Sequence, residues 1–371
     1  YGITAGGAVT DSGTQEITGI TTISASGQDV TLNTSTNNFA NQVRITGAAV
    51  TVVDEDAIIL GNSTVSGTYG ITAGGAITDS GTQEITGVTT LAAGSGNDIT
   101  LDTSTNNFAA AVVITSGNNV AITDEDAIDL GAATVSGTYG ITAGGAVTDS
   151  GTQEIAGATT ISASGQDVTL DISTNNFAAA VGITGAAVTV VDENTIDLGA
   201  STVSGTYTIT ATEGDITDSG NLAITNAATF TTTEASSNII LDQSGNAFSK
   251  KVTMKSGNGT AAFGNLTFVN SGPVRLHTSA DADDDLYINA ATDGTVGGTL
   301  SVTASGDITQ TVPLVVADTT TLAAGSSNDI TLSNASNNFA TVVITSGGDV
   351  NLRDEDAIDL GAATVSGTYG I

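Results

Sequence analysis

Tyr1-Gly2-Ile3-Thr4-Ala5-Gly6-Gly7-Ala8 opens the chain, and the way this stretch recurs decides the fold. It returns almost unchanged at Tyr69 and again at Tyr139, and a divergent copy starts at Tyr207. The final tripeptide, Tyr369-Gly370-Ile371, restates the first one in the same phase. Self-similarity at a fixed period is the signature of repeat architectures. We therefore expect a tandem array, cut as a window from a longer one.

The repeats divide the chain into one repetitive segment. A closing Val-Ser-Gly-Thr ends four of the five copies, and the fourth copy is longer and the most divergent. That fourth copy contains three lysines, Arg275 and the lone His277. The copies span residues 1–68, 69–138, 139–206, 207–299 and 300–368, and residues 369–371 begin the next one.

Short apolar runs alternate with small polar residues throughout each copy. Gly accounts for 46 of the 371 residues and Pro for only 2. Alternation with period two indicates strands, and no segment reads as a helix longer than one turn. In the first copy the expected strands are Ile17–Ile23, Val30–Leu32, Val43–Ile45, Val50–Val53 and Ala57–Leu60. We expect Gly and Asn at the corners between them, where φ > 0 is easiest.

The length of the repeat favours an all-β fold, a parallel β-helix or β-solenoid. The first copy divides into residues 1–25, 26–47 and 48–68, which are suitable lengths for three coils. This division predicts about 16 coils in the array and a rod of roughly 75 to 80 Å, at about 4.8 Å per coil. A string of β-sandwich domains is the weaker alternative, because such a domain wants about 100 residues and usually a large core aromatic.

Composition and charge exclude several partners. Lys and Arg number 6 against 39 Asp and Glu, a formal net charge of −33. Such a surface repels nucleic acid and anionic lipid headgroups, and no apolar run approaches the roughly 20 residues of a membrane-spanning helix. The absence of Cys excludes disulfides and thiolate metal sites.

An Asn-Asn-Phe motif, Asn-Ala-Phe in the fourth copy, supplies one aromatic residue to each copy. We interpret each Phe as an inward-pointing core anchor that follows a turn. On the three-coil division, successive rings lie about 14 Å apart, too far to stack on one another. The five residues are Phe39, Phe108, Phe177, Phe248 and Phe339.

Clustered carboxylates form the most charged repeated element, the Asp-Glu-Asp of residues 54–56 and its copies. Carboxylate oxygens are the ligands that Ca²⁺ prefers, and a denser acidic run lies at 281–285. The alternative is a solvated acidic corner that keeps the molecule soluble and discourages lateral pairing. The candidates for weak Ca²⁺ binding, the only cofactor considered, are Asp54, Asp56, Asp124, Asp126, Asp281, Asp283 and Asp285.

Two further functions are weaker alternatives. A polysaccharide-processing β-helix needs acids together with Arg or Lys at one special place, and a near-identical array offers no such place. We therefore expect no enzyme, and expect Lys250, Lys251 and Lys255 to pair with neighbouring acids. Ice binding needs continuous Thr rows, but the Thr-Thr pairs such as Thr21-Thr22 recur only once per copy.

Several phrases resemble the repeats of filamentous-haemagglutinin-type bacterial exoproteins. They include Asn97–Leu101, Ala127–Ala132, Thr134–Thr138 and Ile141–Gly151. The resemblance covers nearly the whole chain and is weakest over residues 207–299. It implies a right-handed parallel β-helix shaft, export across a Gram-negative outer membrane, and a role in adhesion, aggregation or biofilm.

We therefore predict a structural segment of an extracellular fibrous surface protein or adhesin, acting as a stiff shaft or filament. Adjacent repeats, and other copies in a filament, would be its partners. Regions outside this window would bind the host or neighbouring-cell surface or its glycans. A calcium-dependent adhesive module is the first alternative.

Overall fold

The computed structural model describes residues 1–257, 261–277, 285–290, 292 and 294–371. These residues form parallel β-strands stacked as a β-solenoid of about 18 turns, and they contain no α-helix. The β-solenoid prediction is confirmed. The chain divides into two compact units, residues 1–179 and 180–371.

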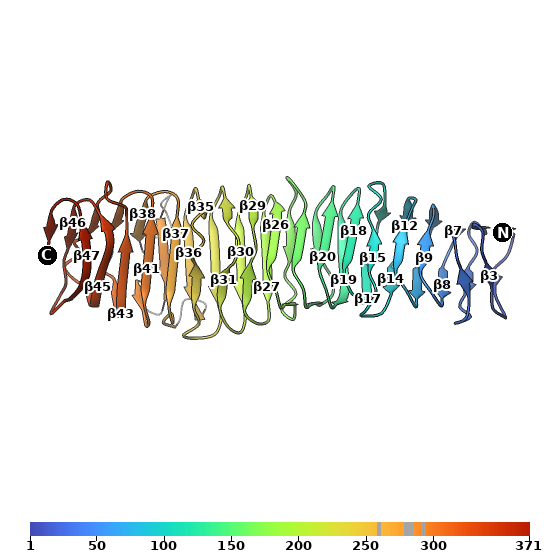
Figure 1. Cartoon of the computed structure of the whole chain (residues 1–371), viewed down its shortest axis with the longest axis horizontal. Coiled ribbons are helices and arrows are strands. Elements are labelled where there is room, and N and C mark those ends of the chain that lie inside the picture. Colours follow the sequence, from blue (N-terminus) through green and yellow to red (C-terminus); the bar gives the residue numbers. More distant parts are fainter. Residues whose placement is uncertain (258–260, 278–284, 291, 293) are drawn as a thin grey trace. The chain divides into compact units, whose positions relative to one another are not determined.

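Strands of two to eight residues build the N-terminal unit, blue to green in Figure 1. They are β1 (Gly2–Thr4), β2 (Val9–Thr10), β3 (Glu16–Ile17), β4 (Thr21–Ser24), β5 (Val30–Leu32), β6 (Asn38–Phe39), β7 (Val43–Gly47), β8 (Val50–Asp54), β9 (Ile58–Leu60), β10 (Ser63–Val65), β11 (Tyr69–Ala73), β12 (Ile77–Asp79), β13 (Gln83–Ile85), β14 (Thr89–Ala92), β15 (Ile99–Leu101), β16 (Asn107–Phe108), β17 (Val112–Gly117), β18 (Val120–Asp124), β19 (Ile128–Val135), β20 (Tyr139–Ala143), β21 (Val147–Asp149), β22 (Gln153–Ile155), β23 (Thr159–Ser162), β24 (Val168–Leu170) and β25 (Asn176–Phe177).

The C-terminal unit continues in the same style. Its strands are β26 (Val181–Gly185), β27 (Val188–Asp192), β28 (Ile196–Leu198), β29 (Ser201–Val203), β30 (Tyr207–Ala211), β31 (Ile216–Asp218), β32 (Leu222–Ile224), β33 (Ala228–Thr232), β34 (Ile239–Leu241), β35 (Ala247–Phe248), β36 (Val252–Ser256), β37 (Leu266–Asn270), β38 (Val274–His277), β39 (Asp285–Asn289), β40 (Thr295–Val296), β41 (Leu300–Ala304), β42 (Ile308–Gln310), β43 (Val315–Ala323), β44 (Ile330–Leu332), β45 (Asn338–Gly347), β46 (Val350–Leu352), β47 (Asp359–Val365) and β48 (Tyr369–Gly370).

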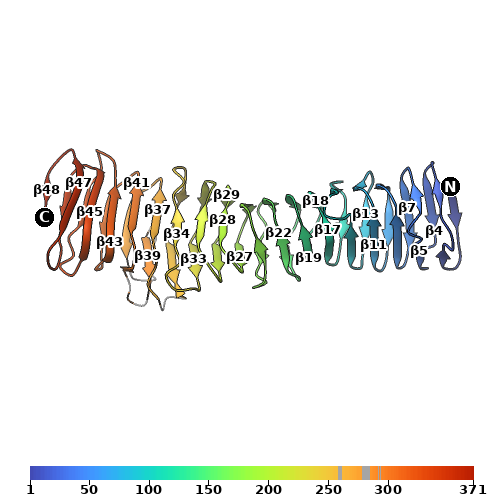
Figure 2. The ribbon, with the colours of Figure 1, turned by 60° about the horizontal axis from the view of Figure 1, so that its bottom comes forward.

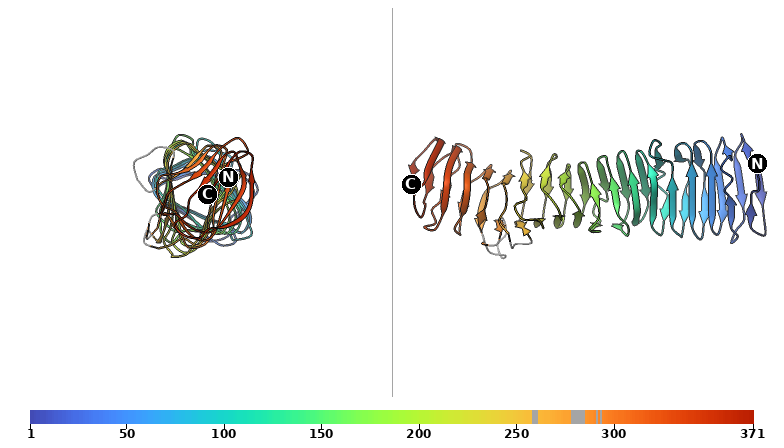
Figure 3. Two further views of the ribbon diagram at one scale, coloured as in Figure 1. Left: turned by 90° about the vertical axis from the view of Figure 1, so that its left-hand side faces the viewer. Right: turned by 90° about the horizontal axis from the view of Figure 1, so that it is seen from below.

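Each turn has two sides, which we call straight and bent. A straight side is one strand, such as β8, and a bent side is two short strands that meet at a corner, such as β9 and β10. β8 pairs in parallel with β11 on the next turn, whereas β9 and β10 pair with β12 and β13. The turns of the N-terminal unit can be followed from blue to green in Figure 2 and in the right-hand view of Figure 3.

The straight and bent sides exchange places along the N-terminal unit. The single strands β8, β11, β14 and β17 stack on one side, opposite split pairs such as β12 with β13. Single strands β18, β20 and β23 then continue on the side of the split pairs, while β21 with β22 follows on the first side.

The exchange follows from the length of the repeat. Seven successive parallel pairings lead from β1 to β20, and β20 contains Gly140, the equivalent of Gly2 two copies later. Each copy in this unit therefore occupies three and a half turns of about 20 residues. The structure has about 18 turns where the sequence predicted about 16 coils, because the turns are shorter than the three-coil division assumed.

Alternate strand residues form a narrow core in both units. The pattern buried, exposed, buried recurs in the strands, as in Ser63–Val65 and Gln83–Ile85. Val, Ile, Leu and Ala fill most of the interior, and Tyr69, Tyr139 and Tyr207 are also fully buried. Stacked turns bury this face between them, which no isolated turn can do.

Glycines serve two purposes at the corners. Gly27, Gly94, Gly165 and Gly325 adopt positive φ, as expected for corners. Gly74 instead lies so close to the preceding turn that an added Cβ would clash with the carbonyl oxygen of Glu55. Close stacking of turns, as well as backbone conformation, thus requires glycine.

Candidate functional site: the polar corners

The recurring Asp-Glu-Asp motif lies where a straight side follows a bent side. Strand β6 pairs with β3 on the preceding turn. On the following turn, β8 ends at Asp54 before it reaches β6. The Asp54 carboxylate takes the place of the missing strand: Oδ2 accepts the Phe39 N–H at 3.1 Å, and Oδ1 accepts the Asp56 N–H at 3.0 Å. Its side chain is 2% exposed, so this carboxylate caps a strand inside the molecule.

The same cap recurs in other copies. Asp124 accepts the N–H groups of Phe108 at 3.0 Å and Asp126 at 2.9 Å. In the C-terminal unit, Asp354 accepts the Phe339 N–H at 2.8 Å. In the divergent copy Asn270 replaces the aspartate, and its Oδ1 accepts the Phe248 N–H at 3.0 Å.

A buried asparagine connects this cap to the preceding turn. Asn37 is fully buried; its Oδ1 accepts the Gln15 N–H at 2.8 Å, and its Nδ2 donates to Asp11 Oδ2 at 2.7 Å. The Asn37 carbonyl oxygen accepts the Glu55 N–H. Asp11, Asn37 and Asp54 therefore form a polar column across three turns.

This column repeats in four further copies with the same atoms or close substitutes. Its Asn donates to an Asp in three of them and to a Gln in the last one. The pairs are Asn106 with Asp79 at 2.6 Å, Asn175 with Asp149 at 2.7 Å, Asn246 with Asp218 at 2.6 Å, and Asn337 with Gln310 at 2.7 Å. Buried polar groups are stable in a core when every member has its hydrogen bonds, and these pairs meet that condition.

Burial controls the ionisation of the column. Desolvation raises the pKa of Asp54 and Asp124 above the ordinary value, although the backbone N–H donors oppose it. Desolvation likewise raises the pKa of Asp149 and Asp218 against the opposing hydrogen bonds from Asn175 and Asn246.

Asp11 behaves in the opposite way. Burial raises its pKa, but donors from Asn37, Thr34 and Asn33 outweigh that effect, so the pKa is lowered overall. Within the polar columns, the pKa of Asp11 is therefore lowered, whereas the pKa values of Asp54, Asp124, Asp149 and Asp218 are raised.

The structure separates the predicted calcium ligands. Asp54 and Asp124 are buried caps, whereas Asp56 and Asp126 are exposed, so the triplet is not the uniformly solvated corner that we expected. Asp281 and Asp283 lie outside the described residues, and only the backbone of Asp285, at the start of β39, is described.

No group of three or more Asp, Glu, His or Cys side chains suited to a metal ion occurs among the residues that the structure describes. Calcium binding stays a prediction.

The five motif phenylalanines are buried, between 1% and 8% exposed. In the C-terminal unit Phe248 packs between Phe230 and Phe268, with ring centroids 6.0 and 5.3 Å apart, and Phe230 also contacts Tyr207. The sequence does not predict this row, because Phe230 and Phe268 belong to separate segments that the turns bring together.

Threonines point both inward and outward. Thr21, Thr89 and Thr159, the first residues of the Thr-Thr pairs, are buried. Outward-facing Thr31 pairs with Thr10 and Thr51 on the neighbouring turns, so other motifs fill the gap that we expected between Thr rows. Gly70 ends this row after three turns. Ice binding stays a minor alternative.

One basic residue contacts an aromatic ring. Lys251 Nζ lies 5.0 Å from the ring centroid of Tyr287, a cation–π contact that the sequence did not predict.

The solenoid and its recurring polar columns define the class of protein, a tandem-repeat β-solenoid. The chain belongs to the family described as repeats of unknown function (DUF5649), whose model matches residues 2–46, 47–115, 117–184, 185–255 and 264–346. No curated protein and no solved structure matches it. Within the described residues, no helix is long and apolar enough to cross a membrane.

Proposed function

We propose that the chain is a structural segment of an extracellular fibrous surface protein, in which it forms part of a stiff shaft. The observation that carries this proposal is the continuity of the parallel ladders within each unit. In the N-terminal unit an unbroken series of pairings links β1 to β20. A rod held by hydrogen bonds along its axis resists bending and extension.

The recurring motifs support a structural role without catalysis. A catalytic site in this motif would use the carboxylates of Asp54 and Asp124. Both oxygens of each carboxylate already accept backbone N–H groups. The recurrence of one cap at several turns serves stability, because each cap closes a gap in the ladder that recurs with every copy.

The net charge supports a role as a separate filament. A formal charge of −33 keeps rods apart at distances near the Debye length, about 8 Å at physiological salt. The resemblance to filamentous-haemagglutinin-type repeats suggests adhesion, aggregation or biofilm as the context, on a Gram-negative bacterium. Binding to a cell surface or glycan would then belong to regions outside this segment.

Fibre diffraction from the aligned full chain tests the shaft. We expect a meridional reflection near 4.8 Å, the spacing of hydrogen-bonded strands along the axis. Electron micrographs that show separate beads without that reflection would exclude a shaft.

Immunogold labelling of producing cells, with an antibody against one consensus copy, tests the location. Label along filaments outside the cell supports the proposal, whereas label confined to the cytoplasm contradicts it.

Calcium dependence is tested separately from the shaft. Heat release on titration with Ca²⁺, together with a melting temperature that falls in EDTA, would favour the calcium-dependent adhesive module. A melting temperature that EDTA leaves unchanged is the result we expect, since the described caps are filled by N–H donors.

A further inference from the structure

One strand of the fourth copy, β39, lies out of chain order and interrupts a pairing that the other copies share. In those copies a valine pairs directly with a leucine of the following bent side. The pairs are Val43 with Leu60, Val112 with Leu130, Val181 with Leu198, and Val342 with Leu360. The equivalent residues of the fourth copy are Val252 and Leu276. Leu286 of β39 lies between them, because it pairs with Val252 on one side and with Leu276 on the other.

Two insertions in the sequence accompany this strand. Val296 follows Leu276 by 20 positions, whereas the equivalent residues of the four other copies are five positions apart. The connection from β36 to Phe263 is six residues longer than its equivalent in the second copy. The additional residues are 279–293 and 257–262, and the first of these ranges contains β39.

The inserted strand makes one side of the C-terminal unit longer than the other. From β33 to β42 that side, which we call the wedge side, has four steps between paired strands, through β36, β39 and β38. The opposite side has only three steps from β34 to β43, through β37 and β41. Since β34 and β43 directly follow β33 and β42 in the chain, β39 is a layer without a counterpart on the opposite side.

A glycine is absent where β39 is present. Glycine follows the paired leucine in the four other copies, as at Gly131 in the second copy. An added Cβ at Gly131 would lie 2.6 Å from Val113 Cγ2, so direct stacking of the two strands requires glycine there. The fourth copy has His277 at this position, and Tyr287 of β39 lies between it and β36. The sequence of the fourth copy is therefore adapted to a permanent additional layer.

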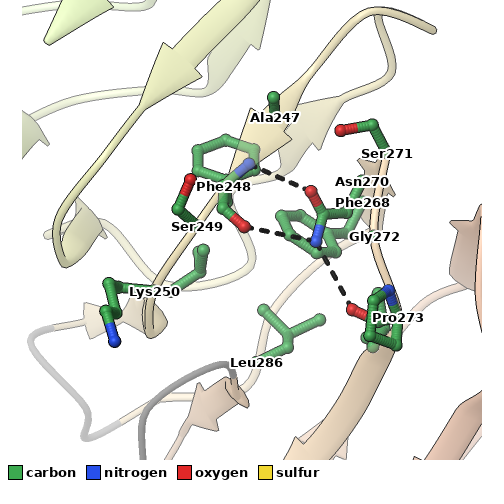
Figure 4. A pocket seen from close by; sticks show the side chains of 12 residues that line it. Ala247, Phe248, Ser249, Lys250, Phe268, Asn270, Ser271, Gly272, Pro273 and Leu286 are labelled. Carbon is green, nitrogen blue, oxygen red and sulfur yellow. Dashed lines mark hydrogen bonds between the residues drawn. The ribbon is translucent and has the colours of Figure 1, made fainter.

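The core beside β39 is incompletely filled. Leu286 of β39, together with Phe248 and Phe268, lines a cavity of about 310 Å³ (Figure 4). Protein interiors contain few spaces larger than a water molecule. A layer that is present on one side only holds the neighbouring strands apart, and this separation accounts for the cavity.

We propose that β39 is a wedge that bends the C-terminal unit, so that the solenoid contains an elbow at the fourth copy. For two sides about 10 Å apart, one additional strand spacing of about 4.8 Å turns the stack by roughly 25°. The elbow gives the proposed shaft a fixed change of direction. The inference rests on the order of the paired strands, and it does not depend on the location of the protein or on its fibrous role.

A straightened variant of the full chain tests the wedge. It lacks residues 257–262 and 279–293 and carries His277→Gly, which restores the glycine of the other copies. Because the chain contains no cysteine, spin labels can be attached to introduced cysteines, and pulsed electron paramagnetic resonance measures the distance between them. One pair of labels, at Thr229 in β33 and Thr309 in β42, spans the wedge side.

The second pair of labels, at Thr217 and Thr321, is the matched control on the opposite side, where an unbroken row of pairings connects the two positions. We expect the Thr229–Thr309 distance to be about 5 Å shorter in the straightened variant than in the parent, and the Thr217–Thr321 distance to be the same in both. An unchanged Thr229–Thr309 distance, or equal shortening on both sides, would overturn the proposal.

Point variants of the full chain test the spacing without any deletion. Gly131→Ala should lower the melting temperature by several degrees, because the added Cβ meets Val113. His277→Ala changes the equivalent position beside β39 and should lower the melting temperature much less. Equal decreases, or a Gly131→Ala variant as stable as the parent, would show that β39 does not separate strands that otherwise need glycine.

Discussion

At the residue scale, the buried aspartate caps decide whether a bent side can be followed by a straight one. Asp124 satisfies two N–H groups that no strand reaches. We expect Asp124→Ala to destabilise the surrounding turns by about 2–4 kcal/mol, because both donors lose their acceptor in or near the core. Asp124→Asn should lose less, since Asn270 already performs the main contact in the divergent copy.

Two measurements test the role of this cap: the hydrogen-exchange rate of the Phe108 amide and the denaturation midpoint. Asp126→Ala is the matched control, as Asp126 is exposed and its Oδ2 accepts a hydrogen bond from Asn107 at 3.5 Å. Equal effects of the two alanine variants would contradict the role of the cap.

The pKa directions of the same residues predict how stability depends on pH. Asp54, Asp124, Asp149 and Asp218 have folded pKa values raised above 3.8, chiefly by burial. A raised folded pKa means that stability is gained as pH falls through that value toward 3.8 and lost as pH rises. Asp11, whose pKa is lowered, acts the opposite way, but only below 3.8.

We therefore expect the melting temperature to rise between pH 7 and about pH 4 and to fall at lower pH. A double variant, Asp124→Asn with Asp149→Asn, should show a smaller rise. A melting temperature that decreases steadily from pH 7 downward would refute the assignment of these burial effects.

The buried hydroxyl of Thr89 offers a gain in stability. Its Oγ1 has no hydrogen-bond partner in the described part of the chain, and the same holds for Thr21, Thr159 and Thr320. Thr89→Val replaces an unsatisfied polar atom by a methyl group of similar size, and should stabilise by about 1 kcal/mol. Thermal melting against the Thr90→Val control, at a position that is not fully buried, measures the difference. A lower melting temperature for Thr89→Val would mean that the hydroxyl is satisfied in solution.

At the element scale, corners depend on close approach between turns. Gly74 and Gly6 occupy the same position of the repeat, but an added Cβ would clash with the Glu55 carbonyl at Gly74 and would meet nothing within 4 Å at Gly6. Gly74→Ala should therefore lower the denaturation midpoint clearly, by about 1–3 kcal/mol, and Gly6→Ala should change it little. Comparable losses in both variants would point to backbone conformation instead of close contact.

The strand boundaries show how much of the fold the sequence predicts. Val30–Leu32 is a strand with the predicted bounds, and Val50–Val53 lengthens by one residue into β8. Ile17–Ile23 was predicted as one strand but is split between β3 and β4, because the chain turns a corner at Gly19. The two-residue strand β6 was missed, since its pairing partner Glu16–Ile17 lies a full turn away.

The sequence did not predict the polar columns either, because their members also lie on different turns. Asp11, Asn37 and Asp54 each look like ordinary turn residues, and only the stacking of turns brings them together. Their recurrence in copy after copy was the available signal. The half turn per copy was likewise hidden, because the number of residues in a turn is set by pairings between distant segments.

At the scale of the whole molecule, the array should accept the removal of one complete copy. Deletion of residues 69–138 joins Thr68 to Tyr139 and recreates the natural Thr138–Tyr139 junction. We expect a folded product with a melting temperature within a few degrees of the parent, because stability in repeat arrays depends on nearest-neighbour contacts.

A deletion of half a turn, residues 74–83, is the contrasting variant. It removes β12, which pairs with β9 on one side and β15 on the other, and should unfold the turns around it. Circular dichroism and thermal melting distinguish the two deletions. Loss of structure in both would mean that copies are not interchangeable.

Because each copy advances the coil by a half-integral number of turns, it matters whether the number of copies is odd or even. Unequal recombination that adds or removes a single copy would move every later surface feature of that coil to the opposite side, whereas a change of two copies would restore it. A change in the number of copies would therefore also change the side on which later surface residues lie. Antibodies or receptors that recognise one side would distinguish variants with an odd number of copies from variants with an even number.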